Sequence, residues 1–255
     1  MSQILLICRK ELKGYFASPI AYLLMAFFGL IFGFGTFTAT RDFVRFSFQM
    51  QMQGGGAPMN INEQIIGPLL NFGSTITLFL VPMITMRLFA EEKKTGTIEL
   101  LLTSPVTDNQ IILGKWLGAM LLYLCILVMS MLNVALLFAW GRPDIKPVLV
   151  AYLGLLLQGG CLLAIGGFIS TLTRNQIIAG GVTFFVCLLL WLLNWATSFD
   201  TTGWASVVNY LSIVTHFDNF SKGVIETKDL IFYVSMIFFA LFITSRSMES
   251  LRWRS

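Results

Sequence analysis

Five long stretches without a charged residue constrain the fold of this chain more than any other feature. They cover residues 14–40, 64–86, 116–140, 147–173 and 175–199. Each is longer than the roughly 18 apolar residues that indicate a transmembrane helix. A sixth stretch, residues 230–245, is shorter, but Arg246 can extend it by reaching the lipid headgroups. We therefore predict an all-α membrane protein with six transmembrane helices, at residues 19–40, 65–88, 111–140, 148–172, 177–197 and 230–245.

The composition agrees with a membrane protein built as one domain. Of the 255 residues, 56% are hydrophobic and only 12% are charged, whereas an ordinary soluble domain is about 25% charged. The net charge of +4 reflects the loops and does not indicate a nucleic-acid surface. Because no internal repeat is visible, residues 1–255 are expected to form a single domain, without the inverted repeats of many secondary transporters.

The distribution of positive charge predicts the orientation in the membrane. If the N-terminus is cytoplasmic, 11 of the 17 lysines and arginines lie on the cytoplasmic side. Cytoplasmic loops carry such an excess of basic residues. The sequence therefore predicts that both termini are cytoplasmic.

The segments outside the spans have their own patterns. Residues 1–18 are predicted to form an interfacial helix, since Ile4, Cys8 and Leu12 share one face while Arg9 and Lys13 share the other. Residues 49–62 contain three consecutive glycines and are expected to form a flexible outer loop. Residues 198–228 are too apolar for a plain loop, and we expect short outer helices between spans five and six.

Several absences limit the chemistry of the chain. The nearest match to a phosphate-binding loop, Gly114-Lys115, lacks the earlier glycine, so neither ATP nor another cofactor is expected to bind. No acidic residue lies inside a predicted span, which argues against an ion-coupled carrier. The four cysteines lack metal-ligand spacing. His216, near Asp218, is expected to be a structural histidine, and we predict no catalytic or metal-binding residue.

Polar and small residues inside the spans leave two interpretations open. Asn71, Ser74, Thr75 and Asn194 either line a transport pathway or form hydrogen bonds between helices, and the second is favoured. The small-residue patterns at 29–33, 160–164 and 166–170 allow helices to approach closely. They indicate packing within the chain, with a dimer seam as the alternative. The phenylalanines of the first span either face lipid or line a lipid-like path.

Residues 86–105 form the only dense block of charge, and it lies between two spans. Thr97 is predicted to cap a short helix, Glu99 complements its dipole, and Pro105 ends it. Thr107 and Gln110 then form a capping box at the start of the third span. The apolar residues of the short helix, at 98 and 100–102, need a cover. Lipid headgroups or a protein groove would provide one, and the protein groove is favoured.

The same block resembles a known family. The runs at 82–92, 96–101, 104–107 and 113–115 resemble the permease subunits of six-helix ABC exporters. The similarity is closest to the gliding-motility-associated (GldF-like) permeases, which are similar to the permease of nitrous oxide reductase maturation. The end of the chain, with His216, Phe220 and Trp253, fits the same family. The resemblance implies a permease of the bacterial inner membrane that is not itself an enzyme.

The resemblance also implies partners and a coupling site. A nucleotide-binding ATPase subunit would bind ATP and dock on a cytosolic coupling helix at residues 97–104. A second permease copy, or a related auxiliary membrane subunit, would complete the transporter in the lipid membrane. The ATPase-coupling residues on this reading are Glu91, Glu92, Thr97, Glu99, Leu100, Leu101 and Pro105.

A different class of function remains open from the sequence. The chain could instead be a non-transporting membrane scaffold of an envelope or gliding-motility complex. A neighbouring gene with a phosphate-binding loop would favour the transporter. No motif specifies the cargo or the direction of transport.

Overall fold

A computed structural model describes residues 3–52, 60–102, 106–141, 143–197 and 210–252. Within these residues the secondary structure is helical and contains no strand. Six segments are long and apolar enough to cross a membrane. These findings confirm the predicted all-α membrane protein.

Five of the six segments are single long helices, and the other combines three helical pieces. The single helices are α2 (Pro19–Met52), α6 (Asp108–Trp140), α7 (Ile145–Leu172), α8 (Gln176–Thr197) and α11 (Thr227–Arg252). The combined segment, Asn62–Thr95, contains the π-helical turn η1 (Asn62–Ile66), α3 (Gly67–Thr85) and α4 (Ala90–Thr95). Among the described residues there are three further short helices: α1 (Gln3–Ala17), α5 (Thr97–Leu102) and α10 (Ile213–Ser221).

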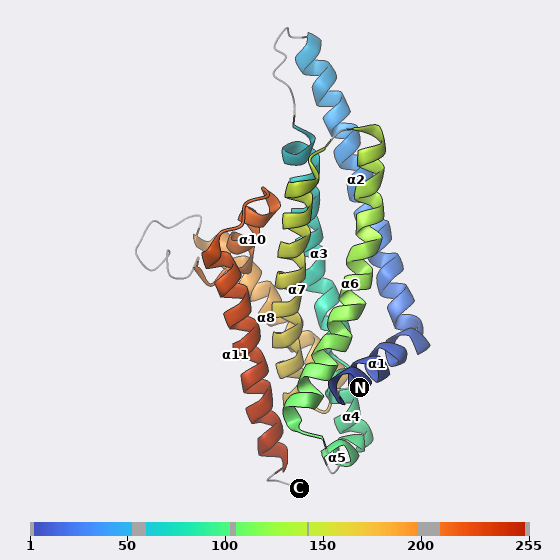
Figure 1. The fold of residues 1–255 in the computed structure, drawn as a ribbon, viewed down its shortest axis with the longest axis vertical. Coiled ribbons are helices and arrows are strands. Elements are labelled where there is room, and N and C mark those ends of the chain that lie inside the picture. The colour runs from blue at the N-terminus through green and yellow to red at the C-terminus, as the bar shows by residue number, and fades with distance from the viewer. Residues whose placement is uncertain (1–2, 53–59, 103–105, 142, 198–209, 253–255) are drawn as a thin grey trace.

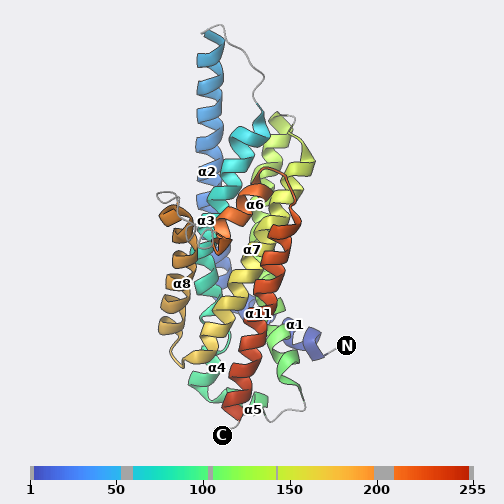
Figure 2. The ribbon, with the colours of Figure 1, turned by 90° about the vertical axis from the view of Figure 1, so that its left-hand side faces the viewer.

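The long helices form an elongated bundle with different structures at its two ends (Figure 1). The helices α4 and α5, together with the last turns of α11, lie at one end, which we call the α5 end; α1 lies just above them (Figures 1 and 2). At the opposite end, α2 projects beyond the other helices (Figure 1). The beginning and the end of the described chain therefore lie toward the same side of the bundle.

The helices α3 and α7 form the centre of the bundle. Helix α7 packs against α3, α6, α8, α10 and α11. Small residues allow these close approaches. A Cβ atom on Gly159 would lie only 2.1 Å from Cε1 of Tyr123 in α6, and one on Gly166 would lie 2.4 Å from Oγ1 of Thr85 in α3. These two glycines of α7 therefore serve packing within the chain.

The glycine pattern of α2 has different surroundings. A Cβ atom on Gly29 would meet nothing within 4 Å, and one on Gly33 would lie 3.4 Å from Oδ1 of Asn133. Close packing within the chain therefore does not require a glycine at position 29, in contrast to positions 159 and 166.

Several helices extend beyond the predicted spans. Helix α2 continues past residue 40 to Met52, and α11 continues past residue 245 to Arg252. These two predicted spans ended just before a charged residue. A charged residue marks the end of the part of a helix that lies in the membrane, but the helix itself can continue beyond it. At 1.5 Å per residue, α11 is about 39 Å long and exceeds the roughly 30 Å hydrocarbon core. The three glycines of the predicted loop lie outside the described residues.

Candidate functional site

The segment Ala90–Leu102, which we call the coupling segment, consists of α4 and α5 joined by a glycine turn. Gly96 has a φ of 74°, a left-handed conformation that glycine adopts without steric cost. Thr97 was predicted to cap a helix beginning at residue 98, but it is itself the first residue of α5. Its Oγ1 lies 2.9 Å from Oγ1 of Thr95, so the two threonines bond across the turn. The sharp bend therefore comes from Gly96.

The start of α4 is fixed to α7 by Ser170. The Oγ of Ser170 accepts hydrogen bonds from the backbone N–H groups of Phe89 and Ala90, each at 3.1 Å. These N–H groups begin a helix and have no partner within it. Lys93 also donates to the carbonyl oxygen of Thr171. Helix α4 is therefore capped and held by the end of a different transmembrane helix.

Glu91 is paired with Arg87 in the preceding turn. The Nε of Arg87 donates to Oε2 of Glu91 at 2.8 Å, and Nη2 donates to Oε1 at 3.1 Å. Nη1 of the same arginine reaches Oγ of Ser18 at 3.4 Å. The sequence placed Glu91 among the ATPase-coupling residues, whereas the structure gives its carboxylate a two-bond partner within the chain.

Glu92 is also paired within the chain, with the buried Lys115 of α6. The Nζ of Lys115 lies 2.9 Å from Oε1 of Glu92 and 2.8 Å from Oε1 of Glu11 in α1. It also donates to the carbonyl oxygen of Leu88 at 2.8 Å. We call Glu11, Glu92 and Lys115 the lysine cluster. Sequence reasoning assigned no partner to Lys115 and did not single out Glu11, although Glu11 is the one acidic residue in α1.

Helix α5 carries exposed residues of the coupling segment. The side chains of Thr97 and Glu99 are exposed, while Ile98 is half-buried and packs against the core. The side chains of Leu100 and Leu101, and Pro105 entirely, lie outside the described residues. Of the predicted coupling residues that are described, two therefore bond within the bundle and two face outward.

The third span begins with the predicted capping box. The backbone N–H of Thr107 donates to Oε1 of Gln110 at 3.2 Å, and both halves of the box are present. The helix begins at Asp108, three residues before the predicted start of the span at 111, because the capped first turn is polar. The capping box is confirmed.

The predicted pathway residues all take part in hydrogen bonds within the chain. Ser74 donates to Oε1 of Gln158 in α7 at 2.8 Å, and Asn71 donates to Oγ of Ser221 in α10 at 3.0 Å. Thr75 donates at 3.2 Å to the carbonyl oxygen of Asn71 in its own helix. Asn194 accepts from Thr215 at 3.4 Å. This geometry favours bonding between helices over a pathway for these residues.

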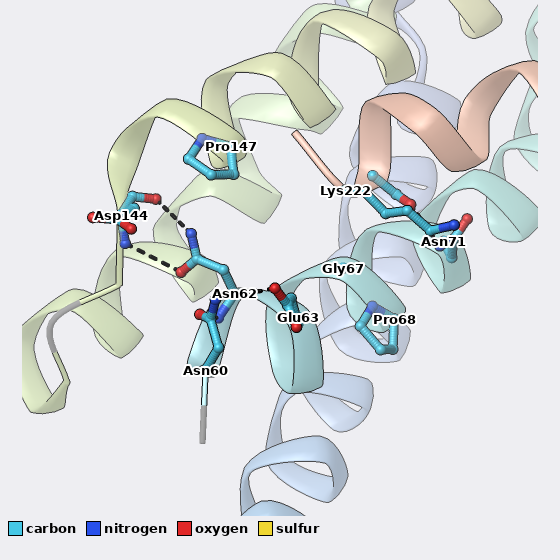
Figure 3. Close-up of a pocket in the computed structure, with 10 residues that line it drawn as sticks. Asn60, Asn62, Glu63, Gly67, Pro68, Asn71, Asp144, Pro147 and Lys222 are labelled. Atoms are coloured by element: carbon cyan, nitrogen blue, oxygen red, sulfur yellow. Dashed lines mark hydrogen bonds between the residues drawn. The ribbon is translucent and has the colours of Figure 1, made fainter. Parts of the chain in front are cut away.

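Asn71 also lines a polar pocket near the end opposite α5 (Figure 3). The pocket has a volume of about 460 Å³ and is lined by residues that include Asn60, Glu63, Asp144 and Lys222. The amide of Asn62 closes one wall, since it donates to the carbonyl oxygen of Asp144 at 2.9 Å and accepts from its N–H at 3.2 Å. The pocket therefore has a rigid rim with charges of both signs.

His216, the single histidine, is a buried residue of α10. Its Nδ1 lies 2.6 Å from Oδ1 of Asp229 in α11, and its Nε2 lies 2.9 Å from the carbonyl oxygen of Tyr210. The sequence drew attention to Asp218 as its neighbour, but the partner is the aspartate at the start of the next helix. Burial of the Asp218 carboxyl raises its pKa.

The fold and the anchored coupling segment together define a class of protein, a multi-pass membrane protein with a short helical segment held at one end of its bundle. A family described as ABC-2 family transporter protein matches residues 5–245. The chain therefore belongs to the ABC-2 transporter family and is a transmembrane permease of an ABC transporter. No curated protein matches the chain.

Proposed function

We propose that this chain is the permease of an ATP-driven exporter and that a separate ATPase subunit docks on α5. The observation that supports this most strongly is the double attachment of α4. One attachment is to α7 through Ser170, and the other is to α6 through Lys115. A force applied to the outward-facing side of α5 would therefore reach two transmembrane helices directly.

The ATPase supplies the energy on this proposal. It binds and hydrolyses ATP, and its closure displaces the coupling segment. Leu100 and Leu101 enter a groove of the ATPase, where burying one leucine contributes about 1.5–3 kcal/mol. Thr97 and Glu99 lie at the rim of that contact. Because Glu91 and Glu92 bond within the chain, we assign them to holding the segment.

The orientation we propose places the α5 end in the cytoplasm of a bacterial cell, with the chain in the inner membrane. The excess of basic residues on that side supports this orientation. Cysteines introduced at Gly55 and Ser206 should react with an impermeant reagent added outside, and cysteines at Thr95 and Ser250 should not. Labelling of Ser250 from outside would contradict the six-span topology.

The complete transporter on this proposal contains a second permease copy or a related auxiliary membrane subunit. The exposed faces of α2 and α8 leave room for such a partner. The resemblance of residues 82–115 to the gliding-motility-associated permeases supports membership of that subfamily and export as the direction.

The test is whether the purified, tagged permease captures an ATPase subunit, sought among neighbouring genes that encode a phosphate-binding loop. The double variant Leu100→Asp and Leu101→Asp should lose capture while it inserts and folds like the unchanged chain. A matched control places the same two changes at the far end of α2, Met50→Asp and Met52→Asp, and should capture the ATPase normally. Normal capture by the Leu100 and Leu101 variant would refute docking on α5. A folded wild-type chain that captures no ATPase would point to the membrane scaffold.

A further inference from the structure

We infer that Lys115 is the positioning residue that attaches α1 to the coupling segment, so that α1, α4 and the start of α6 move as one unit. The inference depends on the proposed function at one point, namely that the ATPase acts on the coupling segment. The attachment itself is a property of this chain alone.

Three oxygens from different parts of the chain surround the ammonium group of Lys115. An ammonium group has three N–H donors and no acceptor. The three oxygens around Nζ are Oε1 of Glu11, Oε1 of Glu92 and the carbonyl oxygen of Leu88, at 2.8, 2.9 and 2.8 Å. The residue is only 1% exposed. Two of these contacts are hydrogen bonds, to Glu11 and to Leu88, and the third is the ion pair with Glu92. Lys115 therefore contacts α1, α4 and the turn before α4.

Close packing places Glu11 where Lys115 can reach it. A Cβ atom on Gly114 would lie 2.7 Å from Cβ of Ile7, and one on Gly118 would lie 2.8 Å from Cβ of Glu11. These two glycines, four residues apart, let α1 cross α6 on either side of Lys115. Tyr15 adds a contact at the end of α1, since its hydroxyl donates to the carbonyl oxygen of Ile84 at 3.2 Å. Burial raises the pKa of Tyr15 and keeps this hydroxyl protonated.

This packing changes the interpretation of α1. The sequence indicated a helix lying on the surface of the lipid leaflet, with its apolar face in the membrane. In the structure Cys8 and Tyr15 are buried, and α1 packs extensively along α6. One side of α1 is therefore part of the bundle, directly above α4 and α5 (Figure 1).

The charges of the cluster make Lys115 its essential member. One ammonium group lies between two carboxylates, and Oε2 of Glu92 is buried with no hydrogen-bond partner among the described residues. Lys10 is the next cation, 4.0 Å from Glu92, but its side chain is 68% exposed. Removing Lys115 therefore leaves two carboxylates facing each other with little compensation. Removing Glu11 breaks only the attachment of α1 and leaves the bond to Glu92. Breaking a buried ion pair by removing one partner is strongly destabilising.

The experiment measures the attachment of α1 without any ATPase. Spin labels at Lys13 and Thr97, both exposed, report the separation of α1 and α5 in a cysteine-free background reconstituted in lipid nanodiscs. The unchanged cluster should give one narrow distance distribution. Lys115→Met should shift the ratio of attached to detached α1 by about tenfold or more, and Glu11→Gln should shift it less in the same direction.

The matched control is Arg246→Met, which removes a cation from the exposed pair with Glu249 in α11. It should leave the distribution narrow. An unchanged distribution in Lys115→Met would overturn the inference. If Lys115→Met does not fold, Glu11→Gln decides by itself, since it keeps the buried lysine paired.

A second readout separates positioning from simple stability. With the ATPase present, Lys115→Met should still capture it, because Leu100 and Leu101 are unchanged, but stimulation of ATP hydrolysis by the permease should be lost. Loss of the attachment with normal stimulation would show that Lys115 has only a structural part and would overturn the inference. If the wild-type chain captures no ATPase, the proposed function fails, while the distance measurement still decides whether Lys115 attaches α1.

Discussion

The central helices α3 and α7 differ from the peripheral helices α2 and α8 far more in burial than in hydropathy. In the most apolar part of α3 and of α7, 67% of the residues are buried, against 22% in α2 and 17% in α8. All four are apolar enough to cross a membrane. Hydrophobicity therefore identifies the helices that enter the bilayer, but it does not tell which of them lie in the middle of the bundle.

The polar residues of the two groups are used in different ways. In α3, Ser74 bonds to Gln158 of α7, and Thr77 lies 3.1 Å from the hydroxyl of Tyr123 in α6. In α2, Thr38 and Thr40 donate to carbonyl oxygens one turn back in the same helix. A hydroxyl facing lipid has no water to bond, so its own backbone is the nearest acceptor. Some polar residues of the central helices, such as Ser74, instead hold helices together.

The largest effect should come from adding a side chain at the closest helix contact. Gly159→Val in α7 would drive a Cβ atom into the ring of Tyr123, and overpacking typically costs about 1–3 kcal/mol, with larger costs for severe clashes. We expect loss of the folded, monodisperse protein in detergent, measured by size-exclusion chromatography and thermal unfolding. Gly181→Val in α8 is the matched control, because nothing lies within 4 Å of its Cβ position. Equal stability of the two variants would remove the distinction between central and peripheral helices.

A smaller effect should come from the bond between Ser74 and Gln158. Ser74→Ala should destabilise the protein by about 1 kcal/mol, a typical value for a hydrogen bond between transmembrane helices. The Nε2 of Gln158 already lacks a partner, so adding Gln158→Met should recover most of the loss. Thermal unfolding measures both. Thr38→Val in α2 is the control, and it should change stability less because that hydroxyl bonds within its own helix. Unchanged stability with impaired transport in Ser74→Ala would instead favour the pathway interpretation.

The smallest effect on the single chain should come from Gly29→Val in α2. The surroundings of Gly29 are open, and such surface changes usually stay within about 0.5 kcal/mol. We expect an unchanged unfolding temperature together with a smaller dimer fraction, measured by mass photometry in nanodiscs. A destabilised monomer would show that α2 packs more tightly than its exposure indicates.

The sequence predicted the features that depend on neighbouring residues and missed those that join distant ones. Uncharged stretches located the spans, and Thr107 and Gln110 located the start of α6, because both signals are local. The bond between Glu11 and Lys115 joins residues 104 positions apart, and Ser170 bonds to Ala90 across 80 positions. No periodicity or motif specifies such pairs. Glu92 was therefore interpreted as a docking residue, since its partner Lys115 lies in another helix. The pair of Glu91 with Arg87 is local, four residues apart, and the spacing of the two charges could have indicated it.

The dependence of α4 on Ser170 has a consequence for biosynthesis. A helix of six residues is not stable in isolation, and the N–H groups that begin α4 bond to a serine about 80 residues further along the chain. During synthesis, the segment leaves the ribosome well before α7 does. The surface proposed to receive the ATPase is therefore completed only after the fourth span has been inserted and packed. On this view, an unfinished or misassembled permease does not present that surface, so recruitment of the motor also reports that the membrane domain has folded.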